Sequence, residues 1–77
     1  LVFYPNPADQ TIYIELPDFT NGFAGLNIID LSGKSVFQAS LHSGISGIDV
    51  GYLPSGIYIA DIRFPDNHVI RKKLVVR

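Results

Sequence analysis

The chain has 77 residues, enough for one small domain and too few for a two-lobed enzyme with a cleft between its lobes. Hydrophobic residues make up 47% and charged residues 17%, which excludes intrinsic disorder, and no apolar run approaches the ~20 residues of a membrane-spanning helix. A net charge of −1 argues against a nucleic-acid binder, and the lack of cysteine excludes disulfides and cysteine-based zinc sites.

The predicted elements begin with a rigid segment. Two prolines in Tyr4-Pro5-Asn6-Pro7 remove two backbone donors, which places this segment at a sheet edge or at the corner where the chain enters the fold. Thr11–Leu16 then alternates apolar and polar side chains, the pattern of a half-buried strand.

A turn and a hairpin follow. Asn21-Gly22 predicts the turn because both residues tolerate positive φ, and the flanking Phe19 and Phe23 are expected to cap one end of the fold. Ala24–Asp30 and Ser35–Leu41 alternate as strands, and Gly33 between them suits the left-handed position of a hairpin loop. Because Ile29 and Leu31 lie on the face opposite to the other apolar residues, we expect the first of these strands to be covered on both sides.

The second half of the chain also consists of strands and turns. The glycine-rich stretch Ser43–Gly51 can hold a short strand, and Pro54-Ser55-Gly56 predicts a type I turn. Ile57–Phe64 and Val69–Val76 read as strands, with a turn at Pro65-Asp66-Asn67 between them. Since no stretch keeps the helical period over three turns, and turn residues recur about every 8–12 residues, we predict an all-β fold, a small antiparallel β-sandwich.

Charge is unevenly distributed along the chain. Residues 1–62 carry one base and six acids, whereas residues 63–77 carry five bases and one acid. Two interpretations of the basic end remain open. It is either a solvated edge strand whose lysines block unwanted pairing, or a recognition element.

Residues suited to catalysis or metal binding are sparse. The two histidines, His42 and His68, lie 26 residues apart, a weak basis for a catalytic triad or a zinc site. The aspartates are scattered rather than clustered as a calcium loop requires. We therefore expect no enzyme activity, no metal and no cofactor.

A carbohydrate-binding or adhesion module is the alternative function. Tyr13 and Glu15 face outward if the neighbouring isoleucines face inward, and Phe19, Phe23 and Tyr52 are candidates for exposed rings that stack on sugars. The competing interpretation assigns these aromatics to the core, because a small sandwich needs their volume.

Four motifs occur in a distinctive order: Tyr4-Pro5-Asn6-Pro7-Ala8, Asp30-Leu31-Ser32-Gly33-Lys34, Leu53-Pro54-Ser55-Gly56-Ile57-Tyr58 and Lys72-Lys73-Leu74-Val75-Val76. With this order and spacing, nearly the whole chain resembles the type A C-terminal sorting domain of the type IX (Por) secretion system of Bacteroidetes. The resemblance implies an Ig-like β-sandwich of about seven strands. It also implies that residues 1–77 are a single sorting domain, a fragment of a larger secreted protein, that serves as a non-catalytic secretion signal. The absence of methionine agrees with such a fragment.

The resemblance further implies partners and a route. The N-terminal cargo domain in the same chain would cross the inner membrane by its signal peptide. The outer-membrane type IX translocon and its shuttle protein would then read the folded domain in the periplasm. A sortase-like cysteine protease would usually remove the domain, leaving the cargo at the cell surface or secreted. No nucleic acid is expected as a partner.

The residues that match the motifs divide into two expected roles. An edge strand can add to a partner's sheet, and we expect lysines on it to steer the strand to an acidic surface. The residues expected to bind the partner are Lys72, Lys73, Leu74, Val75, Val76 and Arg77. Those expected to determine the fold are Tyr4, Pro5, Asn6, Pro7, Asp30, Gly33, Lys34, Leu53, Gly56 and Tyr58.

Overall fold

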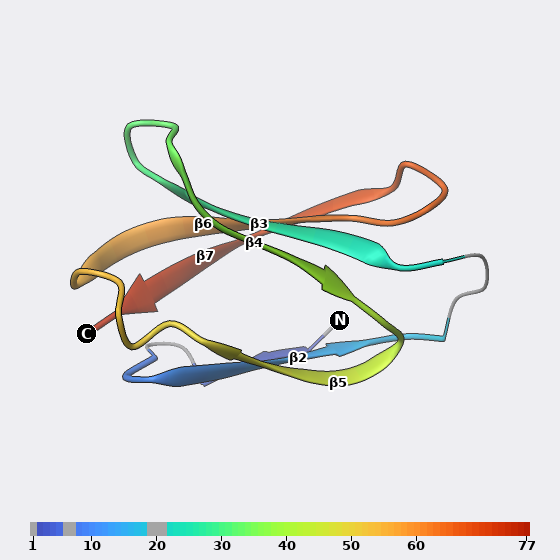
Figure 1. Cartoon of the computed structure of the whole chain (residues 1–77), viewed down its shortest axis with the longest axis horizontal. Coiled ribbons are helices and arrows are strands. Elements are labelled where there is room, and N and C mark those ends of the chain that lie inside the picture. Colours follow the sequence, from blue (N-terminus) through green and yellow to red (C-terminus); the bar gives the residue numbers. More distant parts are fainter. Residues whose placement is uncertain (1, 6–7, 19–21) are drawn as a thin grey trace.

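Seven antiparallel strands build the part of the chain that the computed structural model describes, residues 2–5, 8–18 and 22–77 (Figure 1). Within these residues no helix is long and apolar enough to cross a membrane. The strands are β1 (Val2–Tyr4), β2 (Thr11–Leu16), β3 (Ala24–Asp30), β4 (Ser35–Leu41), β5 (Gly44–Asp49), β6 (Gly56–Arg63) and β7 (Val69–Val76).

The strands form two layers. The smaller sheet has the order β1-β2-β5 and the larger sheet the order β4-β3-β6-β7. In Figure 1 the larger sheet lies above the smaller one, and the chain crosses between them after β2, β4 and β5. The pairings β2–β5 and β3–β6–β7 are the B–E and C–F–G pairings of the Ig sandwich, with β4 held on β3. The predicted seven-stranded Ig-like sandwich is confirmed.

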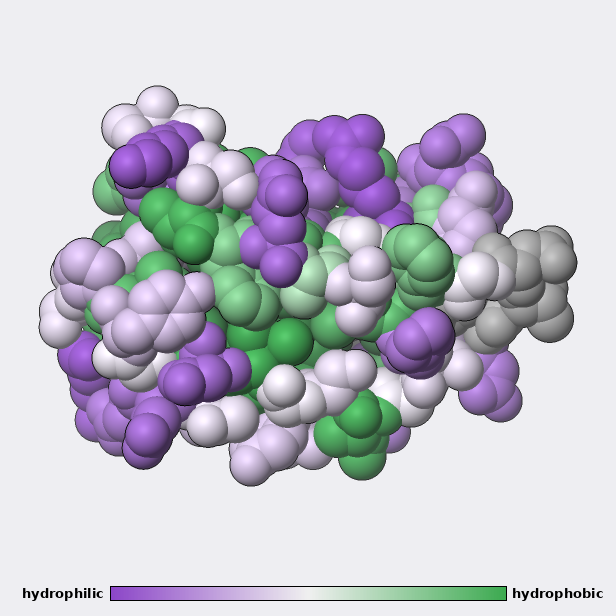
Figure 2. All heavy atoms as spheres, in the orientation of Figure 1, coloured by the Kyte–Doolittle hydropathy of each residue, from purple (hydrophilic) through white to green (hydrophobic). Residues whose placement is uncertain are grey.

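The core follows directly from the alternation in the sequence. Even-numbered side chains of β2, β3, β6 and β7 face the space between the sheets. On the face that Figure 2 shows, hydrophobic side chains gather in the middle, between the layers. Each fully buried isoleucine or leucine contributes about 1.5–3 kcal/mol to folding. The side chains with no exposed surface in β2, β3, β6 and β7 are Ile12, Ile14, Ala24, Ile28, Ala60, Ile62 and Leu74.

Strand β3 is not covered on both sides, contrary to expectation. Leu31 lies just beyond the end of the strand and is 72% exposed, and Ile29 is only half-buried. The reason is the two-layer architecture, because the outer face of the larger sheet has no further layer packed on it.

The turn predicted at Pro54-Ser55-Gly56 lies earlier in the chain. The backbone N–H of Leu53 donates to the carbonyl of Val50 at 3.0 Å, and Gly56 already begins β6. A side-chain hydrogen bond stabilises the corner that follows this turn. The buried Tyr58 hydroxyl donates to the carbonyl of Pro54 at 2.5 Å, four residues upstream, as in the tyrosine corner of Ig-like domains.

Phe23 does not cap the fold as predicted. Its side chain is 54% exposed and meets the ring of His42 edge-on. Ala24 and Leu41, paired across β3 and β4, are fully or almost fully buried and already fill this end of the core. Phe19 lies outside the described residues.

Candidate functional site

Strand β7 forms one edge of the larger sheet and contains most of the basic end of the chain. It pairs with β6 from Val69 to Val76. Because successive side chains of a strand point to opposite faces, the residues expected to bind a partner fall into a buried and an exposed group. Leu74 and Val76 are buried at 0% and 2% exposure. Val75 is half-buried, and the exposed members are Lys72, Lys73 and Arg77.

Lys72 occupies an unusual position for a charged residue. It pairs with Ala60, whose side chain is fully buried, so Lys72 lies on the inward face of β7 although it is exposed. An inward-pointing charge on an edge strand opposes pairing with a foreign strand. Lys72 therefore gives the solvated-edge interpretation a physical basis, independent of any role in recognition.

The edge of β7 is not entirely open. Ala8 forms a parallel bridge with Val76, where its N–H donates to the carbonyl of Val75 at 2.8 Å and its carbonyl accepts from the N–H of Arg77 at 2.9 Å. The Ala8 side chain is fully buried. Thus the chain itself covers the last residues of the edge that a partner strand would extend.

The start of the chain reaches this bridge from the smaller sheet. β1 is an edge strand on β2, as expected for the proline-containing segment, and the Tyr4–Pro5 peptide bond is cis. Asn6 and Pro7 of the same motif lie outside the described residues. The chain therefore pairs first with the smaller sheet, at β1, and then with the larger one, at Ala8.

The Asp30–Lys34 motif forms the β3–β4 hairpin loop. One carboxylate oxygen of Asp30 accepts from the N–H of Ser32 at 2.9 Å, the hydroxyl of Ser32 at 2.6 Å and the N–H of Lys34 at 3.0 Å. Gly33 adopts a φ of 90°, a conformation that a side chain would strain, and its N–H donates to the carbonyl of Asp30. These contacts give Asp30 and Gly33 a structural role.

We expect the pKa of Asp30 to lie below its usual range, chiefly because the Ser32 hydroxyl and then the Lys34 N–H bind its ionised form. The folded-state pKa is the lower one, so this stabilisation is present above the unfolded-state pKa and is lost as pH falls through the folded-state pKa. Ser32→Ala should raise the pKa of Asp30 in an NMR titration, whereas Ser43→Ala should not. A pKa unchanged by Ser32→Ala would contradict the assignment.

Two other aspartates hold turns in the same way. Asp49 accepts from the N–H of Gly51, and Asp66 accepts from the N–H of His68, each at 2.9 Å and two residues on. Sequence analysis treated these acids as scattered. The role of Asp66 was detectable because it stands within the turn predicted at Pro65-Asp66-Asn67, whereas Asp49 stands in the stretch Ser43–Gly51, where a short strand was predicted.

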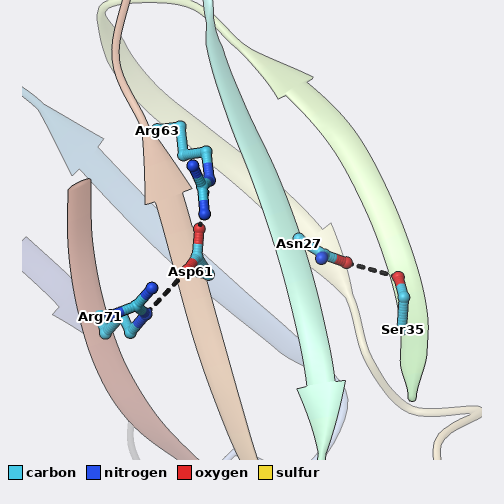
Figure 3. A network of polar contacts seen from close by, with 5 residues as sticks. All are labelled: Asn27, Ser35, Asp61, Arg63 and Arg71. Carbon is cyan, nitrogen blue, oxygen red and sulfur yellow. Dashed lines mark hydrogen bonds and ion pairs between the residues drawn. The ribbon is translucent and has the colours of Figure 1, made fainter. Parts of the chain in front are cut away.

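The fourth described polar cluster lies on the outer face of the larger sheet (Figure 3). Asp61 on β6 is only 4% exposed, although it belongs to the outward-facing set of residues. Its carboxylate accepts from Nε of Arg71 on β7 at 2.9 Å and lies 3.4 Å from Nε of Arg63. On the neighbouring strands the Ser35 hydroxyl donates to Asn27.

The cluster borders an open hollow. Gly25 on β3 has no side chain there, and the space above it is empty within 4 Å of where a Cβ would stand. No pattern in the sequence predicted this site. The polar side chains that line the hollow are Asn27, Gln38, Ser40, Asp61 and Arg63.

Among the described residues, the aromatic rings considered for sugar binding lie against other rings. Tyr4 and Tyr13 are 40% and 42% exposed, but their rings stack on each other with centroids 5.7 Å apart. The ring of Tyr13 also covers Gly47, since a Cβ at Gly47 would stand 3.3 Å from it. Tyr52 lies against Phe37. These rings cover one another and the backbone, so the described residues do not support the carbohydrate-binding alternative.

Comparison with known proteins identifies the family of the chain. No curated protein matches the chain. The sequence model of the family described as the secretion system C-terminal sorting domain matches residues 2–77, which includes all four motifs and both sheets. The chain therefore belongs to this family, and it is a sorting signal that directs proteins into type IX secretion, to the cell surface or out of the cell.

Proposed function

We propose that residues 1–77 act as one non-catalytic unit within a larger secreted protein, and that the outer-membrane translocon and its shuttle protein read the folded unit in the periplasm. The cargo precedes the unit in the chain, and a sortase-like cysteine protease removes it after export. The family match over residues 2–77 carries this proposal. Strand β7 supports it because it combines a buried face with exposed basic side chains.

Within β7 the proposal assigns different tasks to alternate residues. Leu74 and Val76 anchor the strand in the core, so they contribute to recognition by holding it in place. Lys72 and Lys73 are exposed, one on each face of the strand, and they steer the domain to an acidic surface. Arg77 follows the strand and lies 3.8 Å from Asp9 through its Nε.

The test is export of a reporter that carries a signal peptide and residues 1–77 at its end, in a host competent for type IX secretion. The unaltered fusion should appear outside the cell, and Lys72→Glu/Lys73→Glu should remain in the periplasm because its charge opposes the acidic surface. Lys72→Arg/Lys73→Arg keeps the charge and should be exported. Thermal unfolding of each purified domain checks that the substitutions leave the fold intact.

The outcomes separate two ideas. Export of the charge-reversed fusion at the unaltered rate would show that the lysines do not steer recognition. Retention of the unaltered fusion would show that residues 1–77 are not a sufficient signal, which is the broader claim.

A further inference from the structure

We infer that the outer face of the larger sheet docks a protein partner whose surface sets acidic side chains around an apolar centre. The basic face, as we call it, consists of Arg63, Arg71 and Lys73 with Ile29, Ile57, Ile59 and Val75. This inference rests on the proposed function and deepens it, because it names the partner's chemistry and extends recognition from β7 to β6 and β3.

The first support is a separation of charge between the two layers. All six basic residues lie on or next to strands of the larger sheet, together with Asp30, Asp61 and Asp66, for a net charge of +3. The other four acids lie on or next to strands of the smaller sheet, which contribute no basic residue of their own, for a net charge of −4. Arg77, which follows β7, lies 3.8 Å from one of them, Asp9. The two net charges sum to the chain's −1. The outer face of β6 and β7 sets Arg63, Arg71 and Lys73 against the single acid Asp61, so a partner that approaches this face meets a positive surface.

The second support is the arrangement of the two arginines. Asp61 lies between Arg63 and Arg71 and contacts both through Nε (Figure 3). Each guanidinium has five N–H donors, and its contact with Asp61 is made by the one on Nε. The arginine side chains are 66% and 64% exposed, whereas that of Asp61 is 6% exposed. The buried carboxylate orients both guanidinium groups, and the exposed groups suit carboxylates of a partner.

The third support is the apolar half of the face. Ile57 pairs with Val75, and Ile59 pairs with both Lys73 and Ile29, so the four apolar residues adjoin one another and the basic ones. Ile57 is 43% exposed, and the other three are half-buried. An apolar centre with a charged rim is the usual anatomy of a protein interface. These apolar residues favour a protein as the partner, because a lipid phosphate or a nucleic acid would contact only the arginines.

The test uses the reporter fusion again, with substitutions outside the lysine pair. Arg63→Gln, Arg71→Gln and Ile57→Ser should each lower the rate of export, by about tenfold for the loss of a central interface contact. Two controls are matched to them. Lys34→Gln removes one charge away from the face, and Ile45→Ser removes an exposed isoleucine from the smaller sheet. Both controls should be exported at the unaltered rate.

The melting temperature of each purified variant is measured. Export rates are compared only for variants that melt within about 5 °C of the unaltered chain. Because the Ile57 side chain is 43% exposed, Ile57→Ser should leave the fold intact. Its export rate tests the inference if an arginine variant is unstable. Unaltered export from any folded variant of the face overturns the inference. Binding to phosphatidylglycerol vesicles that depends on Arg63 and Arg71 also overturns it, since the face would then read phosphate. Retention of the unaltered fusion inside the cell would instead contradict the proposed sorting function. The proposed docking partner would then be contradicted too, because it belongs to that function.

Discussion

A chain that ends at Lys73 should not fold. Removing residues 74–77 takes away Leu74 and Val76, which are 0% and 2% exposed. Loss of a buried leucine costs about 2–5 kcal/mol, and a domain of this size has a total stability of about 4–12 kcal/mol. The truncation also removes both backbone hydrogen bonds that join Ala8 to the end of β7.

Circular dichroism during heating measures this result. The unaltered chain should melt cooperatively and the truncated chain should show no transition, whereas Lys72→Glu/Lys73→Glu should still melt cooperatively. A cooperative transition in the truncated chain would show that β7 is dispensable for the fold. If the expected result holds, retention of a tail-truncated cargo reports the loss of the fold and says nothing of contacts with the translocon.

Ala8→Asp should be the most damaging single substitution near the start of the chain. The Ala8 side chain is fully buried, and both of its backbone groups bond to β7. A carboxylate placed there has no cationic partner inside the core, and an uncompensated buried charge costs about 3–5 kcal/mol. The melting temperature should fall by roughly 15–30 °C.

The matched control for this substitution is Gln10→Asp, which introduces the same charge at an exposed position two residues on. The control should melt close to the unaltered chain. Hydrogen exchange supplies a second measurement, because the amide of Arg77 donates to Ala8 and should be protected only when that bridge is intact. Equal melting of both variants, or rapid exchange of the Arg77 amide in the unaltered chain, would contradict the bridge.

Most strand boundaries could be predicted because local alternation determines them. The predicted spans Thr11–Leu16, Ala24–Asp30, Ser35–Leu41 and Val69–Val76 are the spans of β2, β3, β4 and β7. The predicted strand Ile57–Phe64 is displaced by one residue, because Gly56 pairs with Val76 and so opens β6. Leu31 misled the prediction because it follows the strand's alternation but stands in the loop.

The candidate site was harder to predict because it depends on contacts across strands. The turn centred on Asp66 places Asp61 opposite Arg71, so this pair could have been found from the hairpin alone. The burial of Asp61 could not, since it needs Arg63 and Arg71 folded over the carboxylate. The bridge between Ala8 and Val76 joins residues 68 positions apart, and no local pattern indicates it.

That bridge makes the fold depend on the synthesis of residues 75–77. A contact between distant positions forms late, because the intervening chain must first be ordered or closed into a loop. Ala8 can join β7 only after Val75 and Arg77 have been made, so an interrupted translation product lacks the finished edge. A product whose translation stops before residue 75 therefore lacks both hydrogen bonds that join Ala8 to the end of β7.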